Sequence, residues 1–413
     1  MEEKKKLEEI KKPKEYSPKV VLSRVELEGY KSIRYVDINL HDGLNIIIGN
    51  NGAGKSNFLN FLHRVINLDF FNINKVKASL FLNREDNINY KIYLENDNSK
   101  PRTEFDSPIK DFFVFREKTA FKIYQNDKMI SEGYNLDEVD KKYLGGELMY
   151  SCQLIRHTIP ENLLFIDIPL SFKIFYKSQS EITSLLFKEN IPYFLKNTFS
   201  YFAFINENDF ESGLTKDFIL ENLSEIYDLI KPLEKYSPIE NIKISDDFNI
   251  HVEEKTGDIT ISNLFLLFKI NDQWLPFSSL SDGTKRLFYI IAEVAFSSRY
   301  RESRTLYLMS VYELSRIILL EEPELGIHPH QLDKLLEFLK EQSKHKQIII
   351  TTHSPQVLDI LQKDELNRII IAEMGENGTT MRHLTEKEEK KAAIYMEDEG
   401  FLSDYWRFSD LNE

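Results

Sequence analysis

The chain has 413 residues, of which 42% are hydrophobic and 29% are charged, so it is long and apolar enough to bury a sizeable core. Its 29 Phe and 20 Tyr argue against general disorder. The formal net charge is −14. A protein that grips DNA with its whole surface is usually basic, so the charge leaves room only for a local DNA-binding patch.

The start of the chain is charged rather than apolar. Met1 to Lys14 lacks the apolar segment of a signal peptide, and we expect a short helix or frayed tail that ends near Pro13. No apolar run reaches the ~18 residues that span a membrane. The one cysteine, Cys152, excludes an intrachain disulfide, and nine scattered His give no zinc pattern. We therefore expect a cytoplasmic protein.

The first third of the chain, 1–77, predicts strands followed by a helix. Strands are expected over 20–28, 34–40 and 44–48, with a turn near Gly29. Apolar residues at helical spacing then predict a helix with one buried face. The members of that face are Phe58, Phe61, Leu62, Val65 and Ile66.

A phosphate loop lies between the third strand and this helix. The segment GNNGAGKS fits the pattern G-x-x-x-x-G-K-[ST], and the flanking strand and helix are the context that such a loop requires, which argues against a chance glycine-rich turn. The glycines let backbone N–H groups turn toward phosphate oxygens, and the helix N-terminus adds its positive dipole end. We expect Lys55 to reach the β- and γ-phosphates of ATP and Ser56 to bind Mg²⁺. The expected nucleotide-binding residues here are Gly49, Asn50, Asn51, Gly52, Ala53, Gly54, Lys55, Ser56 and Asn57.

The middle of the chain changes pattern twice. Alternating runs such as INYKIYLEND and DFFVFRE predict an antiparallel β subdomain over 78–135. A mainly helical pattern with many aromatic residues predicts an inserted helical region over 136–238. Strands return after this insertion, and 239–413 is expected to form the second part of the core.

A second anion-binding segment is expected at LSDGTKR, which opens a helix near Thr284. In the structural interpretation Ser281 only caps this helix. In the functional one its hydroxyl, backbone N–H groups and the helix N-terminus bind phosphate. Because this segment lies over 220 residues after the phosphate loop, Ser281 and Gly283 make sense as groups that close over ATP bound by another copy.

Two carboxylates follow an apolar strand expected over 317–320. Ligands bind at the carboxyl edge of parallel strands, so we expect Glu321 to face Mg²⁺ and Glu322 to orient or deprotonate the attacking water. An acidic turn on a solvated loop is the structural alternative. Asp is the usual residue on the metal side, and the longer Glu321 suggests contact through water or a shifted strand end.

His353 ends the next apolar strand, expected over 348–352, and can therefore point to the same edge. Its expected role is a hydrogen bond to the γ-phosphate or the attacking water, with a purely structural histidine as the alternative. The order strand, helix, strand with apolar strands predicts an α/β fold with a parallel sheet.

The motifs GNNGAGKS, LSDGTKR, IILLEEPELGIHP and TTHSP occur in the order seen in ABC-type ATPases. EGYKSI resembles the opening strand and turn of the RecF/SMC branch. The EEPE…HP variant and the ending GFLSDYWRF resemble the AAA family ATPases of bacterial anti-phage systems, including those of OLD, Septu and PARIS. The resemblance does not extend to residues 78–270, the usual place of a family-specific insertion.

This resemblance implies an ABC-type P-loop NTPase with a mixed sheet, an antiparallel β subdomain and an inserted helical region. It implies Mg²⁺-dependent ATP hydrolysis in a head-to-tail homodimer or higher oligomer, in which Ser281 and Gly283 contact the partner's γ-phosphate. The loop from Glu324 to Pro329 would cross the dimer seam. Gln153 is a candidate for the Mg²⁺-sensing glutamine, with a Gln on a helix surface as the alternative.

The resemblance further implies a nucleotide-gated sensor in anti-phage defence. The 60 residues that follow His353 (413 − 353) are too few for a TOPRIM nuclease and hold no D-x-D pair, so we expect the effector, a nuclease of TOPRIM or another type, to be a separate protein. The alternatives are a RecF-like ATPase of DNA repair or chromosome maintenance, a transporter's nucleotide subunit, and an ATP-gated scaffold with slow turnover.

Overall fold

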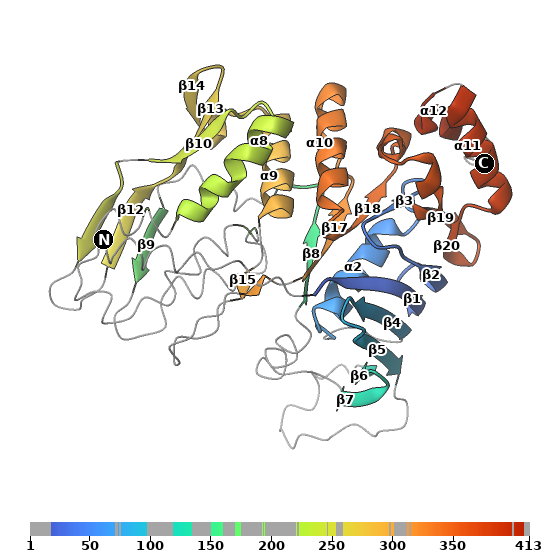
Figure 1. The fold of residues 1–413 in the computed structure, drawn as a ribbon. Helices are drawn as coiled ribbons and strands as arrows, with labels where there is room; N and C mark the ends of the chain where they lie inside the picture. The colour runs from blue at the N-terminus through green and yellow to red at the C-terminus, as the bar shows by residue number, and fades with distance from the viewer. Residues whose placement is uncertain are drawn as a thin grey trace, which may run out of the picture. The chain divides into compact units, whose positions relative to one another are not determined.

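The computed structural model divides into two compact units (Figure 1). Unit 1 comprises Met1–Leu154, Tyr300–Glu322 and Ser343–Glu413, and unit 2 comprises Ile155–Arg299 and Pro323–Gln342. The residues described are 18–70, 76–96, 119–133, 150–159, 170–174, 223–245, 247–252, 259–296, 299–300, 312–313, 315–398 and 400–408, with the isolated positions 73, 192, 194 and 220.

Unit 1 contains a twelve-stranded mixed sheet with the order β7-β6-β5-β4-β1-β2-β20-β19-β3-β18-β17-β8. Its strands are β1 (Val20–Tyr30), β2 (Ile33–Asn39), β3 (Leu44–Ile48), β4 (Lys77–Arg84), β5 (Asn89–Asn96), β6 (Thr119–Gln125), β7 (Lys128–Gly133), β8 (Tyr150–Ile155), β17 (Ser315–Glu321), β18 (Gln347–Thr352), β19 (Ile369–Gly375) and β20 (Gly378–His383). Its helices are α2 (Lys55–Ile66), α11 (Glu386–Asp398) and α12 (Leu402–Phe408), with short 3-10 helices η5 (Pro355–Ile360) and η6 (Lys363–Arg368).

The centre of this sheet is parallel. β17 pairs with β18, β18 with β3, and β3 with β19, all in the parallel sense. All five residues of β3 and all six of β18 are buried, which is the pattern of strands covered on both faces. On one face Ile47, Leu319 and Ile349 share a buried cluster with the apolar side of α2. The carboxyl ends of β3, β18 and β17 therefore meet at one edge.

The hairpin β19–β20 comes from the last part of the chain but lies between β2 and β3. β20 pairs with β2 in parallel at Ile33 and Thr379, and β19 pairs with β3. Beyond β2 the sheet continues with antiparallel strands through β1, β4, β5 and β6 to β7. The described strands of the region expected as an antiparallel β subdomain, β5 to β7, thus extend the same sheet.

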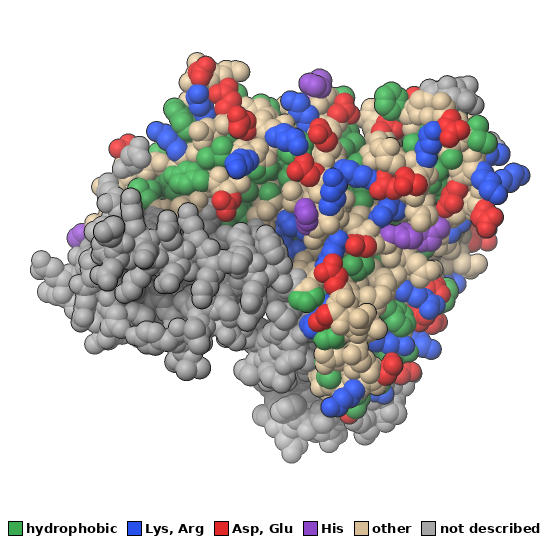
Figure 2. Space-filling view, viewed as in Figure 1, with side chains coloured by type: hydrophobic (Ala, Val, Ile, Leu, Met, Phe, Trp, Pro, Cys, Tyr) green, Lys and Arg blue, Asp and Glu red, His purple; other side chains and the backbone are tan. Residues whose placement is uncertain are grey.

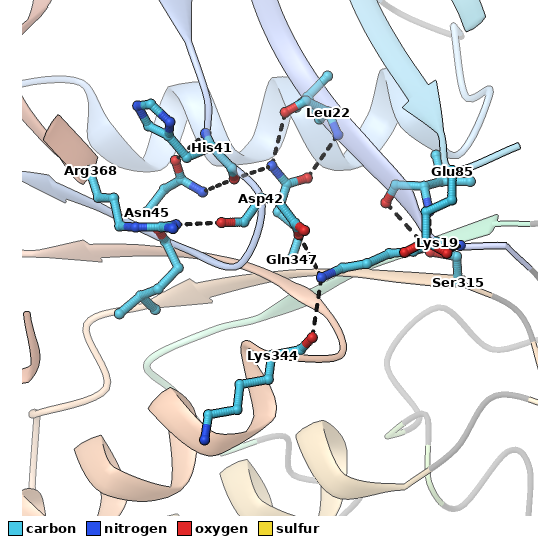
Figure 3. Close-up of polar contacts among 12 residues, drawn as sticks. Lys19, Leu22, His41, Asp42, Asn45, Glu85, Ser315, Lys344, Gln347 and Arg368 are labelled. Atoms are coloured by element: carbon cyan, nitrogen blue, oxygen red, sulfur yellow. Dashed lines mark hydrogen bonds and ion pairs between the residues drawn. The ribbon is translucent and has the colours of Figure 1, made fainter. Parts of the chain in front are cut away.

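The amino-terminal edge of the central strands is fixed by side chains that bond to the backbone (Figure 3). The fully buried Gln347 accepts from Leu22 N at 2.8 Å and donates to the carbonyls of Leu22 and His41 at 2.9 and 3.0 Å. The Asn45 amide bonds to both the N–H and the carbonyl of His41. Arg368 donates to the carbonyls of Asp42 and Leu44. These bonds hold the register of β3 and β18, so the opposite edge is presented in a fixed position.

Unit 2 combines helices with two small antiparallel sheets. Its helices are η3 (Ser224–Leu229), α8 (Ile230–Tyr236), η4 (Phe277–Ser279), α9 (Asp282–Ala295) and α10 (Pro329–Gln342). Its strands are β9 (Leu170–Ile174), β10 (Asn241–Ile244), β11 (Asn249–Val252), β12 (Ile259–Leu264), β13 (Leu266–Ile270) and β14 (Gln273–Pro276), in the orders β10-β13-β14 and β11-β12-β9. The remaining strands are β15 (Arg299–Tyr300) and β16 (Tyr312–Glu313), and β16 belongs to unit 1. The α9 face is packed by aromatic contacts, with the rings of Phe268 and Phe288 4.9 Å apart.

The structure confirms the predicted central strands and the helix that follows the phosphate loop, and it corrects two details. β1 continues through Gly29, and the turn follows at Lys31–Ser32. Strands β8 and β9 lie inside 136–238, where helix was expected, although most of that range lies outside the described residues. The charged start and the strand expected at DFFVFRE also lie outside the described residues. No helix in the described part of the chain has both the length and the apolarity needed to cross a bilayer.

Candidate nucleotide-binding site

The phosphate loop runs from the end of β3 to the start of α2. Gly52 and Gly54 have positive φ angles of 82° and 88°, a region that residues with a side chain rarely adopt. Lys55 is 5% exposed, and its ammonium group donates to the carbonyls of Gly49 at 2.7 Å and Asn50 at 3.0 Å. The Lys55 side chain thus folds back over the loop. Lys55 is the first residue of a twelve-residue helix.

The hairpin β19–β20 supports both ends of this loop. A Cβ on Gly49 would lie 2.0 Å from the Ala372 carbonyl oxygen in β19. A Cβ on Gly54 would lie 2.1 Å from the Thr379 hydroxyl in β20. These glycines are therefore required because the hairpin approaches the loop backbone too closely for any side chain.

A group of polar side chains joins the hairpin, the β1–β2 turn and α2. The amide of Asn57 and the hydroxyl of Thr379 each donate to the Ser32 hydroxyl at 2.9 Å. Thr379 N also donates to the Ser32 carbonyl at 2.9 Å. Asn57, expected to bind nucleotide, thus has its side-chain amide directed to Ser32. No local sequence pattern indicates Ser32 and Thr379, because their partners are distant in the sequence.

The acidic pair lies where β17 ends. Glu321 is the last residue of the strand and is 5% exposed, and Glu322 follows with a φ of 45°. This left-handed backbone is unusual for a residue with a long side chain. The Glu322 N–H donates to the Thr351 carbonyl at 2.8 Å, which fixes the turn against β18.

His353 follows β18 and lies beside the second carboxylate. Its Nδ1 is 3.4 Å from Glu322 Oε1, and the two side chains are 36% and 19% exposed. The register aligns Glu321 with Thr351 and Thr351 with Ile47, one residue before the end of β3. The phosphate loop, the acidic pair and His353 therefore meet at the carboxyl edge of three adjacent strands.

The predicted second anion segment belongs to unit 2. The Ser281 side chain caps α9 by accepting from Thr284 N at 3.2 Å, as the structural interpretation requires. A Cβ on Gly283 would lie 3.0 Å from the Gly326 carbonyl oxygen, so the start of α9 lies against the loop 324–329. Their contact with a second copy stays a prediction.

Gln153 does not lie on a helix surface, because it belongs to strand β8. Its carbonyl oxygen accepts a hydrogen bond from Arg316 near the start of β17, whereas Glu321 ends that strand. This position is remote from the acidic pair along β17. It gives no support to a Mg²⁺-sensing role.

The residues at the carboxyl edge offer oxygen donors to a metal. Ser56 has a hydroxyl and Glu321 a carboxylate, the ligand types that Mg²⁺ prefers, and Mg²⁺ usually adds waters and substrate phosphates. The described residues contain no cluster of three or more His, Cys, Asp or Glu suited to a metal. One hydroxyl and one carboxylate fit a cation whose other ligands are waters and the phosphates of a nucleotide.

The fold and the loop define an ATP-binding P-loop ATPase of the AAA/ABC type. Residues 44–359 match the family model described as "AAA domain, putative AbiEii toxin, Type IV TA system", and the chain belongs to this family.

Two curated relatives are similar at low identity. The Septu protein PtuA of Bacillus thuringiensis is 22% identical over 362 residues, which cover 84% of this chain and 75% of that protein. The endonuclease GajA of Bacillus cereus (strain VD045) is 25% identical over 376 residues, covering 84% of this chain but 58% of GajA. The first of these confirms the resemblance to proteins of the Septu system.

Solved structures of SMC head domains are similar at still lower identity. The SMC head domain from Thermotoga maritima matches with a TM-score of 0.45 and 13% identity, over 88% of this chain and 99% of that one. The Smc head domain with an extended coiled coil bound to the C-terminal domain of ScpA, derived from Pyrococcus furiosus, matches with a TM-score of 0.48 and 15% identity, over 92% and 100%.

Proposed function

We propose that this chain is a Mg²⁺-dependent ATPase that acts as a nucleotide-gated regulator in anti-phage defence and controls a separate effector protein in the cytoplasm. The observation that carries the ATPase part is the meeting of the phosphate loop, Glu321, Glu322 and His353 at the carboxyl edge of β3, β18 and β17. Ligands of open α/β sheets bind at this edge.

Each group has a distinct role in binding and hydrolysis. The loop N–H groups, Lys55 and the N-terminus of α2 bind the phosphates. Ser56 and Glu321 would hold Mg²⁺, and the bound cation would neutralise charge that develops on the phosphate oxygens. Glu322 accepts a proton from the attacking water or orients it, and His353, 3.4 Å from Glu322, donates to the γ-phosphate or to that water.

The site is completed by a second copy. Ser281 and Gly283 lie at the N-terminus of α9 and add N–H donors and a hydroxyl for the γ-phosphate of ATP held by the partner. The contact of Gly283 with Gly326 supports one continuous surface of α9 and the loop 324–329. Two copies would then meet head to tail across two ATP molecules.

The defence role rests on similarity. One relative is named a Septu protein and the other an endonuclease, of which this chain spans 58%. We propose that the effector is a nuclease, such as one of TOPRIM type, on another chain. Copurification of the tagged protein with the products of neighbouring genes, with and without Mg-ATP, tests this. A defence ATPase retains a nuclease, whereas a RecF-like repair ATPase retains DNA in a salt-sensitive way.

The surface gives the repair alternative little support. On the face drawn in Figure 2, acidic and basic side chains of the described residues are interspersed, and no continuous basic stripe crosses that face. This agrees with the net charge of −14.

Lys55→Ala tests the nucleotide site directly. The Lys55 ammonium lies over the loop carbonyls, so its loss removes a phosphate-binding charge without opening the core. We expect the variant to fold, to lose ATP turnover, and to lose the rise in melting temperature that Mg-ATP gives the wild type. An ATP-induced rise equal to that of the wild type would show that the phosphate loop is misassigned.

A further inference from the structure

Thr351 has a buried hydroxyl that neither the fold nor the roles assigned above explain. The residue is 1% exposed, and its Oγ1 has no hydrogen-bond partner among the residues that the structure describes. Burying a hydroxyl without a partner is unfavourable, and valine has the same shape without this cost. The neighbouring Thr352 differs, because its Oγ1 accepts from Ser354 N at 2.9 Å.

The strand pattern places this hydroxyl on the face of the nucleotide site. Leu319 of β17 and Ile349 of β18 are aligned and share the buried cluster with α2. Side chains alternate along a strand, so the residues two positions later, Glu321 and Thr351, point to that same face. Glu321 and Thr351 are also aligned with each other. They stand beside each other at the carboxyl edge.

On its other side Thr351 is aligned with Ile47 of β3, which leads into the phosphate loop. Neighbouring strands are about 4.8 Å apart, so the hydroxyl lies between the strand of the metal-side carboxylate and the strand of the phosphate loop. A metal–nucleotide complex held by both Glu321 and the phosphate loop would therefore lie next to the Thr351 side chain.

We propose that Thr351 binds the hydration shell of the metal–nucleotide complex, with its hydroxyl hydrogen-bonded to a water that Mg²⁺ retains beside Glu321. This rests on the proposed ATPase function. Mg²⁺ sheds its waters reluctantly, and those waters need hydrogen-bond partners. The longer Glu321 side chain, where Asp is usual, favours contact through such a water.

The isosteric change Thr351→Val removes only the hydroxyl. The measured quantity is the Mg²⁺ concentration that gives half of the ATP-dependent rise in melting temperature. The loss of one hydrogen bond predicts an increase of about tenfold in that concentration. Thr351→Ser, which keeps the hydroxyl, should stay near the wild type, as should Thr380→Val, a matched change at an exposed position of β20.

The ligand-free protein supplies a second readout. Because the hydroxyl has no partner among the described residues, Thr351→Val should melt at the same or a higher temperature without nucleotide. A purely structural threonine would instead leave the Mg²⁺ requirement unchanged in Thr351→Val, and that result overturns the proposal. Should Thr351→Val not fold, Thr351→Ala judged against Thr351→Ser gives the same comparison.

The same titration distinguishes a failure of the ATPase proposal from a failure of the role proposed for Thr351. A wild type whose melting temperature does not respond to Mg-ATP contradicts the ATPase proposal itself. The role of Thr351 alone is contradicted if the wild type responds, Lys55→Ala does not respond, and Thr351→Val behaves like the wild type.

Discussion

Glu322 combines a special backbone with the chemistry proposed for the site. A non-glycine residue in the left-handed region costs about 1–3 kcal/mol, and such strain tends to occur at functional positions. Here the strained φ of 45° and the bond to the Thr351 carbonyl set the position of the carboxylate beside His353. The strain is therefore a reason to assign the reaction to Glu322 rather than to Glu324.

Glu322→Gln should stop hydrolysis and leave ATP binding intact. The amide keeps the size but cannot accept the proton, and it removes repulsion between the carboxylate and the γ-phosphate. We expect turnover to fall by about 10²–10⁴-fold, with more nucleotide trapped per chain and larger ATP-dependent assemblies in light scattering.

Glu321→Gln is the matched comparison. It weakens the carboxylate on the metal side, so Mg²⁺-dependent binding itself should fall. Normal turnover in Glu322→Gln would mean that Glu324 or His353 orients the attacking water, and the role proposed for Glu322 would be wrong.

At the scale of elements, the hairpin β19–β20 acts as a support for the phosphate loop. Gly49 is close to the β19 backbone, whereas Gly52 has a positive φ but nothing within 4 Å of its missing Cβ. A comparison of substitutions at these two glycines therefore distinguishes the effect of close packing from the effect of backbone conformation.

Gly49→Ala should destabilise the protein more than Gly52→Ala. The second change costs about 1–2 kcal/mol, the usual penalty of a left-handed backbone with a side chain. The first must push the loop away from the Ala372 carbonyl and should also reduce the ATP-induced stabilisation. Equilibrium urea denaturation of both variants, with and without Mg-ATP, measures this. Equal losses would mean that the hairpin does not support the loop.

The sequence predicts local elements well and their order in the sheet poorly. The apolar runs of β3, β17 and β18 and the glycine spacing of the loop are local signals, and the structure confirms them. The hydrogen bonds that Ser32 accepts from Asn57 and Thr379 join residues up to 347 positions apart, and no local pattern indicates them. β8 and β9 were missed because the residue pattern over 136–238 was interpreted as mainly helical. Thr351 could be found only once the register showed which face it shares.

At the scale of the whole molecule, the head-to-tail site predicts that two inactive variants complement each other. Lys55→Ala keeps the segment of Ser281, and Ser281→Arg keeps the phosphate loop. Their heterodimer contains one intact composite site, so random pairing in an equal mixture should restore up to roughly a quarter of wild-type turnover. ATPase assays of each variant and of the mixture measure this. An inactive mixture in which heterodimers are demonstrated by mass would rule out the shared site.

The strand order of unit 1 also has a consequence for biosynthesis. A ribosome completes the phosphate loop within the first 57 residues, yet the strands that flank and support it in the sheet, β19 and β20, end at residue 383. Contacts across such sequence separations form late, because the intervening chain must first be ordered. While the residues between the phosphate loop and β20 are being made, the nascent chain therefore carries its nucleotide motif without the sheet that shapes it. We therefore expect a new copy to engage ATP only after β19 and β20 have emerged.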